Sequence, residues 1–271
     1  RQSPYIVHWI HYTTCCKMGS PPYELAHIVR QFRDAFMSKH QPPDMHLRVL
    51  DAIANCRTAA LGGHADQCDS CGHIRISYNS CRNRHCPKCQ GTQRERWIAA
   101  RQQQLLPVRY FHVVFTLPQE LNVYCLHYPT ALYNLLFACS KATIETFADD
   151  NKHLGAIPGM ISVLHTWGQN LMLHPHVHMI VPAGGFTPCG HWKHTKQKGS
   201  FLFPVKAMSI VYKNKFMEGM RALINKHNLH PLSTDERKLL YNKPWVVYAK
   251  QPFGGPQQVI EYLGRYSHKV A

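Results

Sequence analysis

Apolar residues recur at three- and four-residue steps over several stretches of the chain, the spacing that places them on one helix face. The steps are clearest over residues 23–39, and Gln41-Pro42-Pro43 ends the predicted helix. Similar patterns predict further helices over residues 44–54, 91–106, 129–148 and 211–227, and one that starts at Gly254-Gly255-Pro256. Core packing is the expected role of the first two helices.

Other stretches are rich in valine, isoleucine and aromatic residues, the composition of β-strands. These predicted strands cover residues 109–117, 161–167, 176–181, 201–205 and 245–250. The second and third are joined by a turn over residues 168–175, which predicts a hairpin. Five strands with intervening helices predict a two-layer α+β domain.

The length of 271 residues is enough for one substantial core and a smaller module. We expect a helical, Cys/His-rich domain over residues 21–106 and the α+β domain over residues 107–271. Residues 1–20 match neither pattern and are assigned no role.

The chain is strongly basic, with 31 Lys and Arg against 15 Asp and Glu and a formal charge of +16. Such a surface attracts polyanions by releasing their condensed counterions, which makes nucleic acid the leading partner over an ordinary basic protein. No apolar run approaches the roughly 18 residues of a membrane span, and we expect no membrane partner. Cysteines that cluster among histidines favour metal in a reducing cytosol over disulfides.

Six of the 11 cysteines lie between Cys56 and Cys89. Two C-x-x-C pairs predict one tetrahedral zinc site, with the ligands Cys68, Cys71, Cys86 and Cys89. A second, mixed zinc site is an open possibility, with the ligands Cys56, His64, Cys81 and His85. Three cations beside these pairs are candidate DNA contacts, namely Arg82, Arg84 and Lys88; a purely structural module is the alternative.

His176 and His178 stand two residues apart in a predicted strand, so their side chains share one face. Such a pair can hold a divalent cation, although strand histidines are often ordinary partly buried residues. The third ligand is expected from the preceding strand of the hairpin, where His165 is the best candidate and Gln169 the second. A catalytic Mg²⁺ or Mn²⁺ is the cofactor this arrangement predicts.

Tyr262 and Tyr266 are four residues apart and share one face of the last predicted helix. A phenol beside a bound cation can attack a phosphodiester, whereas core packing is the alternative role. Trp192 and Tyr212 are candidates to stack DNA bases, with packing again the alternative.

From about Tyr23 to its last residue, the chain resembles the two-tyrosine HUH rolling-circle transposases of the insertion-sequence-91 type. The resemblance rests on six blocks in the family's order: 56–64, 79–90, 111–118, 165–169, 176–178 and 262–268. Because the family continues well beyond a position equivalent to Ala271, the resemblance implies a nuclease domain that is incomplete at its C-terminus and of impaired activity.

The resemblance implies an HUH endonuclease domain, with a central antiparallel sheet of about five strands, behind a small zinc-binding domain. It further implies a transposase that nicks and rejoins single-stranded DNA through a 5′-phosphotyrosine at Tyr262 or Tyr266. The partners would be the single-stranded ends of a mobile element and target DNA, in the bacterial cytoplasm at the nucleoid. Two alternatives remain: a zinc-module nucleic-acid binder without catalysis, and an HUH replication initiator.

Overall fold

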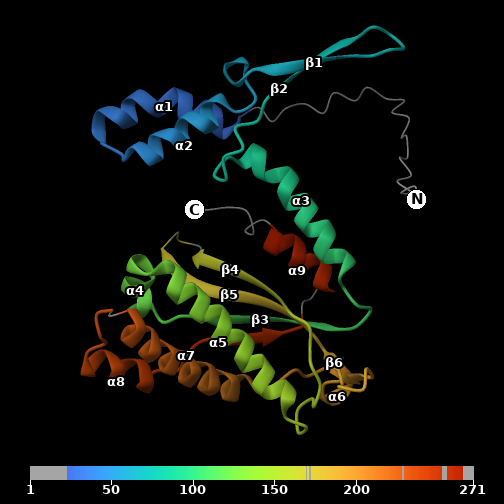
Figure 1. The fold of residues 1–271 in the computed structure, drawn as a ribbon, viewed down its shortest axis with the longest axis vertical. Helices are drawn as coiled ribbons and strands as arrows, with labels where there is room; N and C mark the ends of the chain where they lie inside the picture. The colour runs from blue at the N-terminus through green and yellow to red at the C-terminus, as the bar shows by residue number, and fades with distance from the viewer. Residues whose placement is uncertain (1–22, 169, 171, 228, 252–254, 265–271) are drawn as a thin grey trace. The chain divides into compact units, whose positions relative to one another are not determined.

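In the computed structural model, the described residues are 23–168, 170, 172–227, 229–251 and 255–264. The chain forms two compact units that divide between Cys86 and Pro87 (Figure 1). The sequence pattern places the boundary later, at residue 106. The difference arises from helix α3 (Pro87–Gln103), which contributes Ile98 to an apolar cluster of unit 2.

Unit 1 begins with two packed helices, α1 (Leu25–Lys39) and α2 (Asp44–Asn55), joined by an ion pair between Arg33 and Asp51. Both helices confirm the sequence prediction. A short 3₁₀ turn, η1 (Ala59–Leu61), then leads to an exposed hairpin of β1 (Gly63–Gln67) and β2 (Ile74–Tyr78).

Unit 1 has a small core among the described residues. Its buried side chains are Ala26, Ile53, Ala54, Cys56 and Cys86. So few apolar groups supply little stabilisation, and two of the five are thiols, which makes a metal the expected source of the rest.

Unit 2 is built on an antiparallel sheet in the order β4-β5-β3-β8. Its strands are β3 (Tyr110–Thr116), β4 (Ile161–Trp167), β5 (Leu173–Pro182) and β8 (Val247–Lys250). The expected α+β architecture and the hairpin of β4 and β5 are therefore confirmed. The strand predicted over residues 201–205 was wrong, because this apolar segment runs irregularly, with Leu202 and Phe203 buried, and helix α7 begins at Val205.

The helices of unit 2 lie on both faces of the sheet (Figure 1). Besides α3 they are α4 (Asn122–His127), α5 (Pro129–Asp149), α6 (Lys196–Gly199), α7 (Val205–His227), α8 (Thr234–Asn242) and α9 (Gly255–Gly264). The turn η2 (Gln119–Leu121) precedes α4, and a two-stranded hairpin of β6 (Gly184–Phe186) and β7 (Trp192–His194) follows β5. Among the described residues, every helix is too short or too polar to traverse a bilayer.

Alternation along the strands gives the sheet two different faces. Val113, Phe115 and Met179 join the large core with side chains of α5 and α7. Side chains of opposite parity, such as Ile180 and Val163, join a smaller cluster with residues of α3 and α9. This second face also carries the histidines that the sequence nominates.

Candidate metal and nucleophile site

The antiparallel pairing of β4 with β5 brings three predicted ligands together. His165 pairs with His176, and His178 lies two residues further along on the same face. The ring centroid of His165 is 4.2 Å from that of His178 and 5.2 Å from that of His176. One ring nitrogen from each of the three lies within 4.8 Å of the others. The structure thus groups the nominated histidines as a compact triad.

In His176 and in His178, one ring nitrogen takes part in a hydrogen bond, and the other is available to bind a metal. Nδ1 of His176 lies 2.6 Å from the backbone oxygen of His174, so this nitrogen donates and Nε2 keeps its lone pair. Nδ1 of His178 lies 2.7 Å from Nε2 of His112, while Nε2 of His178 is buried with no hydrogen-bond partner. A buried nitrogen without a partner is costly, and a cation would satisfy it.

The triad is held in its neutral form. Burial, reinforced by the neighbouring histidines, lowers the pKa of His165 to about 4 and that of His178 to about 2. Burial also lowers the pKa of His176. Neutral imidazoles are the form that binds metal, so the site fits a divalent cation without first releasing protons at pH 7.

These lowered values predict that the metal-free protein loses stability in acid. In the unfolded chain the rings take up protons below their ordinary pKa near 6.5, whereas the folded chain resists protonation down to about 4 at His165 and about 2 at His178. The free energy of unfolding should therefore fall as pH drops below about 6.5. Urea unfolding between pH 7.5 and 5, without added divalent cations, measures it.

The control for this pH dependence is the exposed His174 on the same strand. His178→Ala should flatten the fall in stability, whereas His174→Ala should change it much less, because His174 acts on the triad only through its smaller electrostatic effect on the pKa of His176. Equal slopes in the parent and both variants would contradict the assignment of the proton uptake to the triad.

His112 is a site residue that the sequence analysis missed. It lies on β3, diagonal to His178, and the two rings stack with centroids 4.9 Å apart. When Nδ1 of His178 donates to Nε2 of His112, Nε2 of His178 keeps its lone pair and faces the triad, so His112 has the role of an outer partner to a metal ligand. A polar residue inside the otherwise apolar run 110–115 was the signal that pointed to it.

Tyr262 reaches the triad from helix α9. Its ring centroid is 6.1 Å from that of His178 and 6.4 Å from that of His165. The buried residues Val259, Ile260 and Leu263 place the helix, because they pack in the smaller cluster with Val163 and Ile180. Gly264 allows close approach to α3, since a Cβ there would meet Ile98 at 2.5 Å. Tyr266 and Gln169 lie outside the described residues.

The cysteines group differently from the sequence prediction. Cys56, Cys81 and Cys86 gather with Cys89, which follows Cys86 by three residues, and their sulfur atoms lie within 4.8 Å of one another. Zinc with bonds of about 2.3 Å needs sulfurs about 3.8 Å apart, so this set fits a tetrahedral ion after small side-chain shifts. Cys56 and Cys86 are buried, as structural zinc ligands generally are.

The structure corrects the first predicted zinc set, because it separates Cys68 and Cys71 from Cys86 and Cys89. Cys68 and Cys71 lie exposed in the turn between β1 and β2, and five-residue strands carry that turn some 15 Å from the base of the hairpin. Backbone hydrogen bonds from Cys71 and Ser70 lower the pKa of the Cys68 thiol. Among the described residues, the pair does not join a group of three or more potential metal ligands.

The mixed second set is also not brought together. Cys56 and Cys81 belong to the four-cysteine cluster, whereas His64 is exposed on β1, where it lies 3.7 Å from Asp66. His85 is half-buried and does not join the cluster. Of the predicted DNA contacts, Arg82 and Arg84 are exposed and Lys88 is half-buried on the first turn of α3.

Two family models match successive parts of the chain. Residues 28–117 match the family described as "Transposase zinc-binding domain", and residues 159–271 match the family described as "Putative transposase". The "Putative transposase y4qJ" of Sinorhizobium fredii is 44% identical over 261 residues, which cover 92% of this chain and 65% of that protein.

The "Transposase for insertion sequence element IS801" of Pseudomonas savastanoi is 28% identical over 244 residues, 83% of this chain and 56% of that protein. The chain thus spans less than two thirds of the length of each of these relatives. Among solved structures, the conjugative relaxase TrwC in complex with oriT DNA aligns at 9% identity and a TM-score of 0.33, over 58% of this chain and 71% of that one. With both family domains present in order along the sequence, the chain belongs to the transposases of the insertion-sequence-91 type.

Proposed function

We propose that this protein nicks and rejoins single-stranded DNA during rolling-circle transposition, through a 5′-phosphotyrosine intermediate. One observation carries the proposal: the rings of His165, His178 and Tyr262 lie within 6.4 Å of one another on a single face of the sheet. Three neutral nitrogen ligands beside a phenol are the groups that a metal-assisted phosphoryl transfer to tyrosine requires.

The residues that would hold the catalytic cation are His165, His176 and His178. A bound Mg²⁺ or Mn²⁺ would neutralise charge on a nonbridging phosphate oxygen and orient the phosphorus. Three imidazoles suit Mn²⁺ better than Mg²⁺, which prefers oxygen ligands. His112 acts as a positioning residue, because its hydrogen bond sets the ring orientation of His178.

Tyr262 is the proposed nucleophile. Its phenolic oxygen forms a bond to phosphorus while the bond from phosphorus to the 3′ oxygen breaks. The phenol proton is transferred, through solvent, to that departing oxygen, which leaves a free 3′-hydroxyl. The energy of the broken linkage stays in the phosphotyrosine, so a second 3′-hydroxyl can reverse the step and join a new strand. Tyr266, four residues further in sequence, is proposed to cleave the second strand.

The zinc module is proposed to help bind the ends of the mobile element. A zinc ion held by Cys56, Cys81, Cys86 and Cys89 would make the module rigid. Two exposed cations of the module, Arg82 and Arg84, are proposed to contact phosphates or base edges.

A covalent-capture assay tests the proposal. The protein is incubated with Mn²⁺ and end-labelled single-stranded DNA, and a protein-linked band is sought on a denaturing gel. His178→Ala should raise the Mn²⁺ concentration needed for half-maximal adduct about 100-fold, because it removes one ligand. His174→Ala, a neighbouring exposed histidine that keeps its backbone carbonyl, is the matched control and should behave as the parent chain.

Two results would count against the proposal. A chain that forms no adduct at any Mn²⁺ concentration, yet binds the same DNA, would be a binding protein without catalysis. A His178→Ala variant with an unchanged Mn²⁺ requirement would remove the triad from the chemistry.

A further inference from the structure

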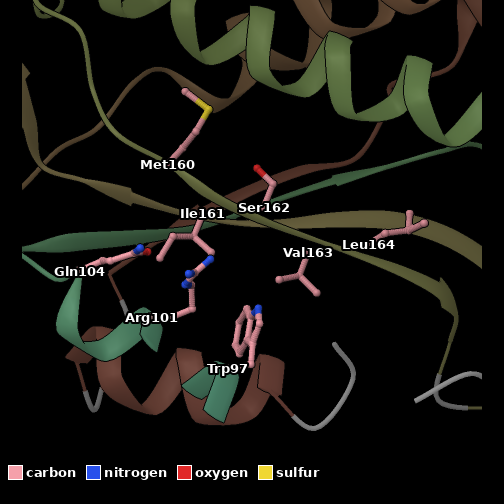
Figure 2. Close-up of a pocket in the computed structure, with 8 residues that line it drawn as sticks. All are labelled: Trp97, Arg101, Gln104, Met160, Ile161, Ser162, Val163 and Leu164. Carbon is pink, nitrogen blue, oxygen red and sulfur yellow. The ribbon is translucent and has the colours of Figure 1, made fainter. Parts of the chain in front are cut away.

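An open groove runs along the free edge of the sheet in unit 2. Strand β4 lies at the end of the strand order and pairs only with β5 among the described residues. Residues 160–164 form one wall, and the other wall consists of Trp97, Arg101 and Gln104 from α3 (Figure 2). The volume is about 450 Å³. We call this hollow the edge groove.

The spacing of the α3 residues explains the second wall. Trp97, Arg101 and Gln104 follow at steps of four and three, so they project from one side of the helix toward the strand. Figure 2 shows Ile161 and Val163 pointing toward these side chains, whereas Met160 and Ser162 point the other way.

The chemistry of the edge groove suits an anion that carries flat rings. Nε of Arg101 is buried and has no hydrogen-bond partner, and none of the eight lining residues is acidic. The Trp97 indole is half-buried, which leaves part of its ring for contact. An unpartnered guanidinium next to an indole offers a phosphate contact and a stacking surface side by side.

The hollow continues beyond this groove. A second hollow of about 270 Å³ shares Gln104, Met160 and Ile161 with it and adds Phe186 and Trp192 of the β6–β7 hairpin. Aromatic rings therefore occur at two points along one path. Trp192 therefore lines an open hollow, whereas Tyr212, the other predicted stacking residue, is fully buried in the core.

The groove leads to the triad. Ile161, Val163 and His165 alternate along β4 and share one face, so His165 follows the groove wall by two residues, about 7 Å. We propose that the edge groove binds single-stranded DNA next to the scissile phosphate, with a base on Trp97 and a phosphate on Arg101, an inference that rests on the proposed function. A single strand is favoured over a duplex because its base faces are open to stacking.

The test compares two arginines of the same helix. Arg101 lines the groove, whereas Arg96 is exposed on α3 and does not. Binding of a fluorescent oligothymidylate to the full chain is measured by anisotropy at several salt concentrations, without added divalent cations. Arg101→Gln should weaken binding about tenfold and lower the slope of log Kd against log salt by about 0.7, the value for one lost phosphate contact on a single strand. Arg96→Gln should change neither.

Two further variants separate a specific contact from a folding defect. Arg101→Lys keeps the charge and should restore the salt slope, and Trp97→Leu should weaken binding about tenfold while leaving that slope unchanged. Equal losses of DNA affinity in Arg101→Gln and Arg96→Gln, or no loss in either, would overturn the proposal. If DNA affinity is unchanged in both variants, the open edge of β4 would instead be a candidate site for adding a peptide strand to the sheet.

The covalent-capture assay distinguishes failure of this inference from failure of the proposed function. If the edge groove is right, Arg101→Gln reaches the parental adduct rate at saturating DNA and differs only in the DNA concentration required. If the parent chain and Arg101→Gln form adduct at the same DNA concentration, the edge groove does not bind the DNA, while the proposed nuclease function stands.

Discussion

Cys86→Ser should release zinc from the protein and unfold unit 1. Cys86 is 1% exposed and sits in the cluster with Cys56, Cys81 and Cys89. Structural zinc in small modules contributes on the order of 10 kcal/mol, far more than the few kcal/mol expected from a core this small. The zinc content per chain should fall by one equivalent, and limited proteolysis should cleave within residues 23–86 while unit 2 resists.

Cys68→Ser is the matched control, because Cys68 belongs to a C-x-x-C pair like Cys86 but lies exposed in the hairpin turn. It should keep the zinc of the four-cysteine cluster and the parental proteolysis pattern. If Cys68→Ser loses as much zinc as Cys86→Ser, and Cys56→Ser loses none, the grouping by spacing is right and the structural grouping is not.

This contrast shows what spacing alone could not predict. Two C-x-x-C pairs are equivalent as sequence, and their natural grouping is with each other. The exposed hairpin of β1 and β2 carries one pair away from the base of the module, where Cys56 and Cys81 meet Cys86. Which cysteines come together depends on the path of the strands between them. An exposed strand such as β1 has no alternating apolar face, so its path is hard to predict from the sequence.

The helices and strands were predictable where one face is apolar over many residues. The helix predicted over 129–148 is α5, and the alternating segment 161–167 is β4. The strand over residues 201–205 was predicted wrongly because an irregular segment with buried apolar side chains has the same composition as a strand. The polar helix α8 was missed, although Ser233 and Glu236 form a capping box that marks its start.

The triad was predictable for a physical reason, since a residue period of two puts His176 and His178 on one face whatever the rest of the fold. The hairpin then supplied His165 as a neighbour across the pair. His112 was not predictable in the same way, because it reaches His178 only through the pairing of β3 with β5, between segments about 60 residues apart in sequence. Long-range pairing of this kind is not visible in local periodicity.

Tyr262→Phe should reduce covalent adduct formation by at least about 10³-fold, because it removes the oxygen that bonds to phosphorus and leaves the ring in place. DNA affinity, thermal stability and Mn²⁺ binding should stay at parental values. Tyr241→Phe is the matched control, since Tyr241 is 40% exposed on α8 and Tyr262 is 41% exposed on α9. The measurement is the initial rate of appearance of the protein-linked band.

Substitution of the second tyrosine, Tyr266, tests which phenol attacks first. Tyr266→Phe should slow the joining of a second strand while the first adduct still forms at the parental rate, because Tyr262 is the phenol beside His165 and His178. If Tyr262→Phe forms adduct normally and Tyr266→Phe does not, the order of attack is the reverse of the one inferred from these ring contacts. If the double variant still forms the band, neither phenol is the nucleophile, and the convergence of Tyr262 with the triad has another role.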